Sequence, residues 1–173
     1  MAWRAIAEGI AEAIREDEVL HDDGNVSVVV EDKGDYNYQI SEALARMGVC
    51  VTVAVVAFRR VERSPVLQGT LELEVSCYEH PSLNRDDPST MTAQGVMERL
   101  AKVLHYRRFP FLANQLIFKD FRREDVDEAN IARGSFEANT LLGYENAWAE
   151  ERRNGNDAWE GETKRSKKWD NQT

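Results

Sequence analysis

Apolar residues recur every three or four positions in three segments of the chain, which is the spacing of an amphipathic helix. Residues 2–16 carry charged residues between the apolar positions and predict a helix that packs on a sheet through one stripe. Residues 36–47 predict a shorter helix, and residues 92–105 predict a third, which Ser89 or Thr90 can cap. The three stripes consist of Trp3, Ile6, Ala7, Ile10, Ala13 and Ile14; Tyr36, Ile40, Ala43, Leu44 and Met47; and Ala93, Val96, Met97, Leu100, Val103 and Leu104.

Three further segments predict the first strands of a sheet. Residues 26–30 form a short β-branched run. Residues 49–61 are apolar on both alternating faces, so we expect a central strand that is covered on both sides. Residues 67–77 alternate apolar and polar positions, which predicts one buried face and one solvent-exposed, acidic face that includes Glu72 and Glu74. Because the connection between these last two segments is short, we expect them to pair as antiparallel neighbours.

The second half of the chain predicts the rest of the sheet. Residues 79–88 have the composition of a loop, and residues 116–121 predict another strand, which a charged turn at 122–128 ends. A final strand at 131–142 precedes Gly143, where we expect the domain to end. The element order predicts an α+β fold, in which a mostly antiparallel sheet of about four or five strands is packed by about three helices. An extended C-terminal tail follows this domain.

This C-terminal arm, residues 144–173, differs in composition from the domain at 1–143. It contains seven acidic and six basic residues and no apolar periodicity, so we do not expect it to fold by itself. It nevertheless carries three of the four tryptophans, Trp148, Trp159 and Trp169. Tryptophans are costly to leave in water and are typical of anchors that dock on another protein. We therefore predict that these three residues contact neighbouring subunits.

Length and charge narrow the class of protein. A chain of 173 residues is one domain, and a formal charge of -9 disfavours a protein whose main partner is nucleic acid. The longest apolar run, Val49–Phe58, is about half of the ~20 residues that span a bilayer. The first residues lack the apolar segment of a signal peptide, so we expect a cytoplasmic protein without membrane contact.

The two cysteines, Cys50 and Cys77, lie in apolar strands, which indicates buried thiols instead of a disulfide or a metal pair.

Few residues carry candidate chemistry. Glu72 and Glu74 lie about 7 Å apart on one predicted strand face, a spacing that a paired-carboxylate mechanism or a magnesium site uses. Ser76 stands where a restriction-like nuclease would have a lysine, and His80 and Cys77 would point to opposite sides of a strand. The sequence has no nucleophile elbow and no glycine-rich phosphate loop. We therefore predict no catalytic, metal-binding or cofactor-binding residues.

One stretch of the sequence combines a strand, a loop with a Glu-x-Pro and an Asn-Arg sequence, and a helix that ends in Leu-His. Together with the order of elements over residues 1 to about 143, this stretch resembles the tail terminator, or tail completion, proteins in the necks of tailed bacteriophages. The arm has no counterpart in that resemblance. The residues that carry it are Leu71–Tyr78, Glu79–Pro81, Asn84, Arg85 and Thr92–His105.

The resemblance implies a structural virion protein that has no active site and no cofactor. Such a protein forms a ring of about six subunits on the end of the tail tube, stops tube polymerisation and provides the joint to the head. Its partners are then its own copies, the major tail tube protein and the head–tail connector or neck protein. DNA is only cargo that passes through the channel. The protein would be assembled in the host cytoplasm and would reside in the tail or neck of the virion.

Within such a ring, two sets of residues become candidates for contact. Glu72 and Glu74 form a predicted lumen-facing acidic strand, where negative charge lets DNA slide without binding. The second set is a candidate interface loop, which consists of His80, Pro81, Asn84 and Arg85.

Three other functions fit the same sequence. The chain can be a head–tail joining adaptor instead of the terminator itself. It can be a metal-dependent hydrolase or nuclease that uses Glu72, Glu74 and His80. It can also be a cytoplasmic adaptor that binds a partner through the tryptophans of its arm.

Overall fold

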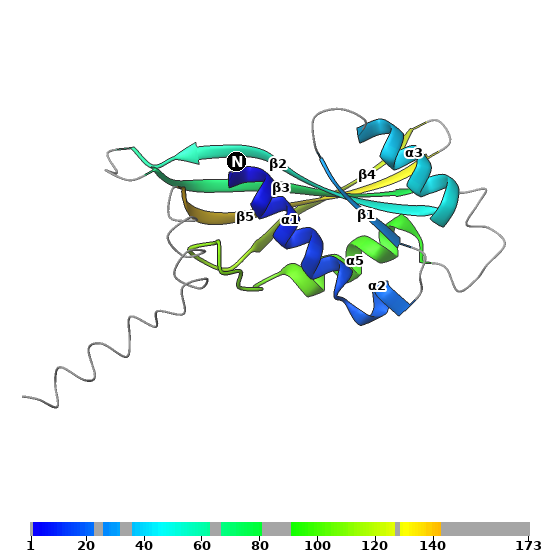
Figure 1. The fold of residues 1–173 in the computed structure, drawn as a ribbon, viewed down its shortest axis with the longest axis horizontal. Helices are drawn as coiled ribbons and strands as arrows, with labels where there is room; N and C mark the ends of the chain where they lie inside the picture. Colours follow the sequence, from blue (N-terminus) through cyan, green and yellow to red (C-terminus); the bar gives the residue numbers. More distant parts are fainter. Residues whose placement is uncertain are drawn as a thin grey trace, which may run out of the picture. The chain divides into compact units, whose positions relative to one another are not determined.

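The computed structural model describes residues 2–22, 26–31, 36–62, 67–80, 91–126 and 129–142. Within them the chain forms a five-stranded mixed sheet and four helices, so the predicted α+β class is confirmed (Figure 1). None of these helices is long and apolar enough to cross a membrane. The helices are α1 (Ala2–Arg15), α2 (Glu18–Asp22), α3 (Tyr36–Met47) and α5 (Ala93–Leu104). The strands are β1 (Val26–Val30), β2 (Val49–Arg60), β3 (Leu67–Glu79), β4 (Ile117–Val126) and β5 (Ala129–Leu142).

The strands lie in the order β1-β2-β3-β5-β4, so β1 and β4 form the two edges of the sheet. β2 and β3 pair antiparallel over most of their length, as the short connection between them predicts. β4 and β5 are also antiparallel, whereas β1 runs parallel to β2. The pairing shifts register between Val55 and Ala57 in β2 and between Phe118 and Asp120 in β4. Such shifts bend a strand and increase its local twist.

The main core lies between the sheet and the helices α1, α2 and α5, which cover one of its faces (Figure 1). The predicted apolar stripes of α1 and α5 point into this layer, and alternate residues of β2, β3 and β5 meet them. Each large side chain removed from water contributes about 1.5–3 kcal/mol, so burial holds these helices on the sheet far more firmly than helix propensity does. The fully buried residues of this layer include Ile6, Ile10, Ile14, Val49, Val51, Leu71, Leu73, Met97, Leu100, Leu104 and Phe136.

On the opposite face, α3 covers only part of the sheet (Figure 1). Its buried residue Ile40 belongs to a small separate cluster with Cys50 of β2. Residues 49–54 of β2 are buried, but the second half of the strand is not, and Val56 is 55% exposed. The prediction that residues 49–61 are covered on both sides is therefore right for the first half and wrong for the second, because α3 packs on the beginning of the strand.

β4 differs most from its predicted boundaries. The charged residues at 122–126 belong to this strand and not to a turn. β4 is an edge strand and is mostly exposed, so it tolerates charged side chains, which also discourage pairing with another chain.

Two other elements also differ from the prediction. Glu79 belongs to the end of β3 and not to the loop. The pattern does not predict α2, because its five residues are too few to display a helical period.

The N-cap of α5 lies two or three residues after the predicted caps. Thr92 is the N-cap, and its hydroxyl oxygen accepts a hydrogen bond from the N–H of Gly95 at 3.1 Å. Ser89 and Thr90, the predicted caps, lie outside the described residues.

Cys50 and Cys77 are free and buried, as predicted. Cys77 lies in the layer beneath α1 and α5, whereas Cys50 lies under α3, so the two thiols are on opposite faces of the sheet. Burial raises the pKa of the Cys50 thiol to about 12 and raises the pKa of Cys77 as well. Both cysteines therefore behave as small apolar core residues.

Asp17 joins the turn between α1 and α2 to α5. Its carboxylate accepts two hydrogen bonds from Arg99, at 3.2 Å from Nε and 2.9 Å from Nη2. It also accepts the backbone N–H of Leu20 at 3.2 Å. Burial by itself would raise the pKa of Asp17, but the Arg99 and Leu20 hydrogen bonds outweigh it and lower the pKa below its ordinary value.

We predict opposite effects on stability for two glycine-to-alanine substitutions. At Gly69 a Cβ atom would collide with the carbonyl oxygen of Arg59 and the ring of Phe58, so Gly69→Ala should lower the free energy of unfolding by about 1–3 kcal/mol. At Gly95 the nearest atom would be 3.4 Å away, so Gly95→Ala should raise the free energy of unfolding by up to about 1 kcal/mol. Chemical denaturation measures both values, and changes of the same sign would contradict this packing.

We also predict a pH-dependent effect for Asp17→Asn, which keeps the size of the side chain but removes its charge. Because the folded-state pKa of Asp17 is depressed, its stabilising effect is complete above the unfolded-state pKa of about 3.9 and is lost as the pH falls through the lower folded-state pKa. The variant should therefore be less stable than the wild type at neutral pH, and the difference should shrink in acid. A difference that stays constant between about pH 7 and about pH 2 would refute the ion pair's role.

Candidate interaction surface

Within the described residues, the face of the sheet opposite α1 and α5 is open beyond the part that α3 covers. We call this region the open face; polar side chains of β3, β5 and β4 point into it. A hollow of about 320 Å³ lies in it. The hollow is lined by Glu74, Asp120, Arg122, Glu124, Arg133 and Ser135.

Arg133 of β5 connects three strands across this hollow. Its Nη1 donates to Glu74 of β3 at 2.8 Å and to Ser76 at 3.2 Å, and its Nε donates to Glu124 of β4 at 3.1 Å. The guanidinium also lies 5.9 Å from the centre of the Tyr78 ring. Burial would lower the pKa of Arg133, but the hydrogen bond with Glu74 and the other acidic contacts raise it above its ordinary value. The positive charge at the centre of the open face is therefore permanent.

Two further carboxylates of the open face also have arginine partners. Glu72 of β3 forms an ion pair with Arg59 of β2, whose Nη2 lies 2.6 Å from Oε1. On the edge strand, Asp120 lies 3.2 Å from Arg122. The open face therefore presents pairs of opposite charge and not a continuous acidic strip.

This arrangement suits contact with another polar surface. Paired charges that are fixed on a rigid sheet give a binding surface its specificity and register more than its affinity. The same arrangement is poorly suited to a cation, because a guanidinium lies beside each carboxylate. Among the described residues, no group of three potential metal-ligating side chains comes together.

Several residues singled out in the sequence lie in or near this region. Glu72 and Glu74 share one face of β3, as predicted, but the expectation of a uniformly solvent-exposed acidic face is wrong. Ser76 is only 2% exposed, and the glutamates are paired with arginines because neighbouring strands bring Arg59 and Arg133 to the same face.

The structure tests little of the other predicted contact residues. The backbone N–H of His80 donates to the carbonyl of Gly48 at 3.0 Å, which places this residue beside the start of β2. The rest lie outside the described residues, so the interface loop and the tryptophan anchors stay predictions, and so does the direction in which the Glu72 and Glu74 face of β3 would point within a ring. The residues outside are Pro81, Asn84, Arg85, Trp148, Trp159 and Trp169.

Sequence reasoning missed two residues that organise this part of the fold. Arg133 is the single basic residue of β5, but its partners are visible only once β5 is known to lie between β3 and β4. Glu79 is 7% exposed, and its carboxylate accepts the N–H of Ala93 at 2.9 Å, at the first turn of α5. A glutamate at the end of an apolar strand and before a helix is the sequence signal that could have identified it.

We predict that Arg133 stabilises the sheet and that Arg122 does not. Arg133→Leu removes hydrogen bonds to the partly buried Glu74 and to Glu124, so it should lower the free energy of unfolding by about 1–2 kcal/mol. Arg122→Leu changes an exposed ion pair and should lower it by less than about 0.5 kcal/mol. Urea denaturation of both variants measures the difference, and equal losses would show that the network contributes nothing beyond a surface ion pair.

Comparisons with known proteins give a fold and not a family. No protein-family model matches the sequence, and no curated protein matches it. Among solved structures, a chain from the virion of a native gene transfer agent (GTA) particle has a similar fold, with a TM-score of 0.54 and 13% sequence identity. The similarity covers 80% of this chain and 97% of that chain. Nearly all of the neighbour therefore shares the fold, whereas about a fifth of this chain lies outside the match.

Proposed function

We propose that this chain is a structural component of a phage-like particle. The observation that carries the proposal is the similarity to a chain of a gene transfer agent virion, which extends over 97% of that chain. Because the similarity extends over almost all of that chain, the two proteins share a complete domain fold and not only a local motif. The open face, with its fixed pairs of charges, is the kind of surface through which such a component contacts a neighbour.

In its finer form, the proposal is that about six copies form a ring on the end of the tail tube. The ring stops tube polymerisation and provides the joint to the head connector, so its partners are the major tail tube protein and the connector. The support for this form is the resemblance of residues 71–105 to tail terminator proteins, together with an α+β fold like that of a particle component. A head–tail joining role would use the same surfaces and differs only in the neighbours.

The pairing of charges changes what such a channel would offer to DNA. If the open face lines the channel, Glu72 and Glu74 face the DNA together with Arg59 and Arg133. Such a wall is polar but nearly neutral, and it lacks the row of unpaired cations that would hold phosphates by counterion release. We propose that DNA passes this wall because the arginines are already engaged by carboxylates.

The hydrolase alternative is less well supported by the same contacts. Glu72 forms an ion pair with Arg59 and Glu74 accepts a hydrogen bond from Arg133, which disfavours a metal ion at either carboxylate. A cytoplasmic adaptor that binds through the arm remains a second candidate because three tryptophans lie in residues 144–173.

Deletion of the gene from a particle-producing strain tests the proposal. We expect tails of uncontrolled length and heads without tails by electron microscopy, and normal particles when the wild-type gene is restored. The Glu72→Gln variant keeps the shape of the side chain and should also restore head-joined tails of normal length, whereas a hydrolase that depends on this carboxylate would fail to do so. Normal, head-joined tails in the deletion strain would contradict the proposed function.

A further inference from the structure

The two edges of the sheet differ in their protection against pairing with another chain. β4 carries six charged residues and an irregular register, and both features hinder the addition of a strand. β1 has no charged residue: its five positions are four valines and one serine. Valine is among the residues that favour strands. β1 is therefore the edge that is chemically suited to accept a further strand.

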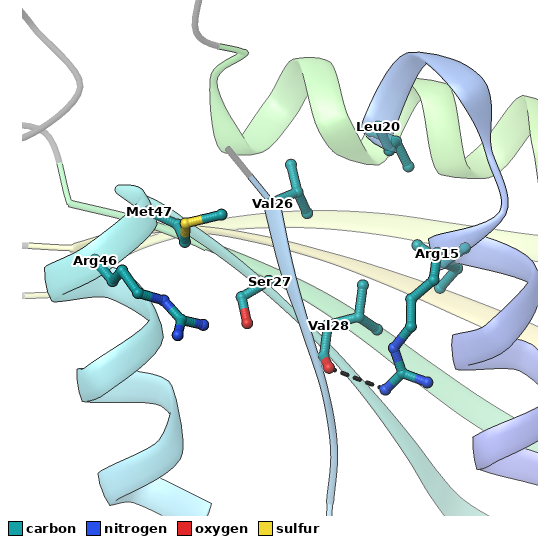
Figure 2. Close-up of a pocket in the computed structure, with 8 residues that line it drawn as sticks. Arg15, Leu20, Val26, Ser27, Val28, Arg46 and Met47 are labelled. Atoms are coloured by element: carbon teal, nitrogen blue, oxygen red, sulfur yellow. Dashed lines mark hydrogen bonds between the residues drawn. The ribbon is translucent and has the colours of Figure 1, made fainter. Parts of the chain in front are cut away.

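The backbone of β1 has outward-pointing groups for such pairing, one of which, the Val28 carbonyl, is engaged by Arg15 in a bond that an added strand would replace. The N–H of Glu31, which follows the strand, donates to a carbonyl of β2, and backbone groups alternate in direction along a strand. By this alternation the N–H and C=O groups of Val26, Val28 and Val30 point away from β2. The Val28 carbonyl agrees with this direction, because it accepts a hydrogen bond from Arg15 Nη2 at 3.1 Å (Figure 2).

A cleft of about 390 Å³ lies along the same edge. Figure 2 shows the side chains of Arg15 and Arg46 on opposite sides of β1, with Val26 and Val28 between them. The cleft thus combines an apolar floor with two positively charged sides. Its lining residues are Ile14, Arg15, Leu20, Val26, Ser27, Val28, Arg46 and Met47.

The two arginines contribute unequally to this positive charge. Arg15 lies 3.9 Å from Glu8 and 3.5 Å from Glu12, so its charge is partly balanced within α1. Arg46 lies in the last turn of α3 and is exposed. Arg46 is therefore the residue through which an acidic occupant gains most, and it is the residue to change in a test.

The arm contains one segment whose chemistry complements this edge. Residues 144–151 contain three glutamates, no basic residue, no glycine and no proline, and they include Trp148. Residues 154–163 have the same net charge and a tryptophan, but they contain two glycines, which weaken a strand. Residues 164–173 are basic. Among these three segments, only the first combines acidity with the absence of glycine and with two aromatic residues, Tyr144 and Trp148.

We propose that residues 144–151 of one copy add to the outer edge of β1 in a neighbouring copy, with the indole of Trp148 in the cleft and the glutamates beside Arg46 and Arg15. This inference rests on the proposed function, because it names a contact that joins the copies of the ring. The segment and the edge are different surfaces of the chain, so the contact is heterologous, and contacts of that kind repeat from copy to copy and form a ring when the rotation between copies closes. Main-chain hydrogen bonds would supply affinity, and the cleft would supply specificity.

Fluorescence anisotropy of a labelled synthetic peptide of residues 144–151, titrated with the full chain, tests the contact. We expect saturable binding, and binding at least about tenfold weaker for the charge-matched peptide of residues 154–163. Arg46→Glu should weaken binding of the first peptide at least about fivefold. Arg122→Glu, on the opposite edge of the sheet, serves as the matched control and should leave binding unchanged.

A backbone variant tests strand addition separately from charge. Val28→Pro removes an outward N–H and is tolerated on an edge, so it should weaken peptide binding while the circular dichroism spectrum stays that of the wild type. If Val28→Pro does not fold, the peptide affinity of Arg46→Glu alone tests the proposal. Equal binding of the two acidic peptides, or unaltered binding by Arg46→Glu, would overturn the proposal.

Sedimentation of the full chain distinguishes binding of the arm to a neighbouring copy from binding of the arm to its own copy. Contact between copies predicts association that increases with concentration and that Trp148→Ala reduces. A chain that stays monomeric while the peptide still binds it would overturn the contact between copies. Neither result decides the proposed function, which the gene deletion tests independently.

Discussion

Burial of alternate strand residues under α1 and α5 is the constraint on which the rest of this structure depends. Because side chains alternate along a strand, burying Leu71 and Leu73 beneath the helices places Glu72 and Glu74 on the other side of the sheet. α3 covers only the part of that side over β1 and the start of β2. The open face is thus the direct consequence of a sheet that has two helical layers of unequal size.

Charge pairing then makes the open face a defined surface. Arg133 holds carboxylates from β3 and β4 against β5, so three strands share one network of hydrogen bonds. At the end of β3, the carboxylate of Glu79 receives the N–H of Ala93 and ties the strand to the first turn of α5. The polar side chains therefore hold strands and helix in register, and the open face carries a rigid pattern of opposite charges.

Much of the fold could be predicted from periodicity, and the errors have physical causes. The spacing of apolar residues located α1, α3 and α5 to within two residues, because each buries one stripe. The same reasoning predicts the end of β4 too early, because it treats the charged residues at 122–126 as a turn. These residues belong to an edge strand, whose side chains are exposed. The Arg133 network could not be predicted, because its members become neighbours only through the strand order β3-β5-β4.

The position of this chain within purified particles tests the central claim most directly. Cryo-electron microscopy of particles that carry an affinity-labelled copy of the chain would locate the label. The account predicts a ring of label at the end of the tail tube nearest the head. Absence of the chain from purified particles, or label confined to the capsid shell or to the far tip of the tail, would contradict it.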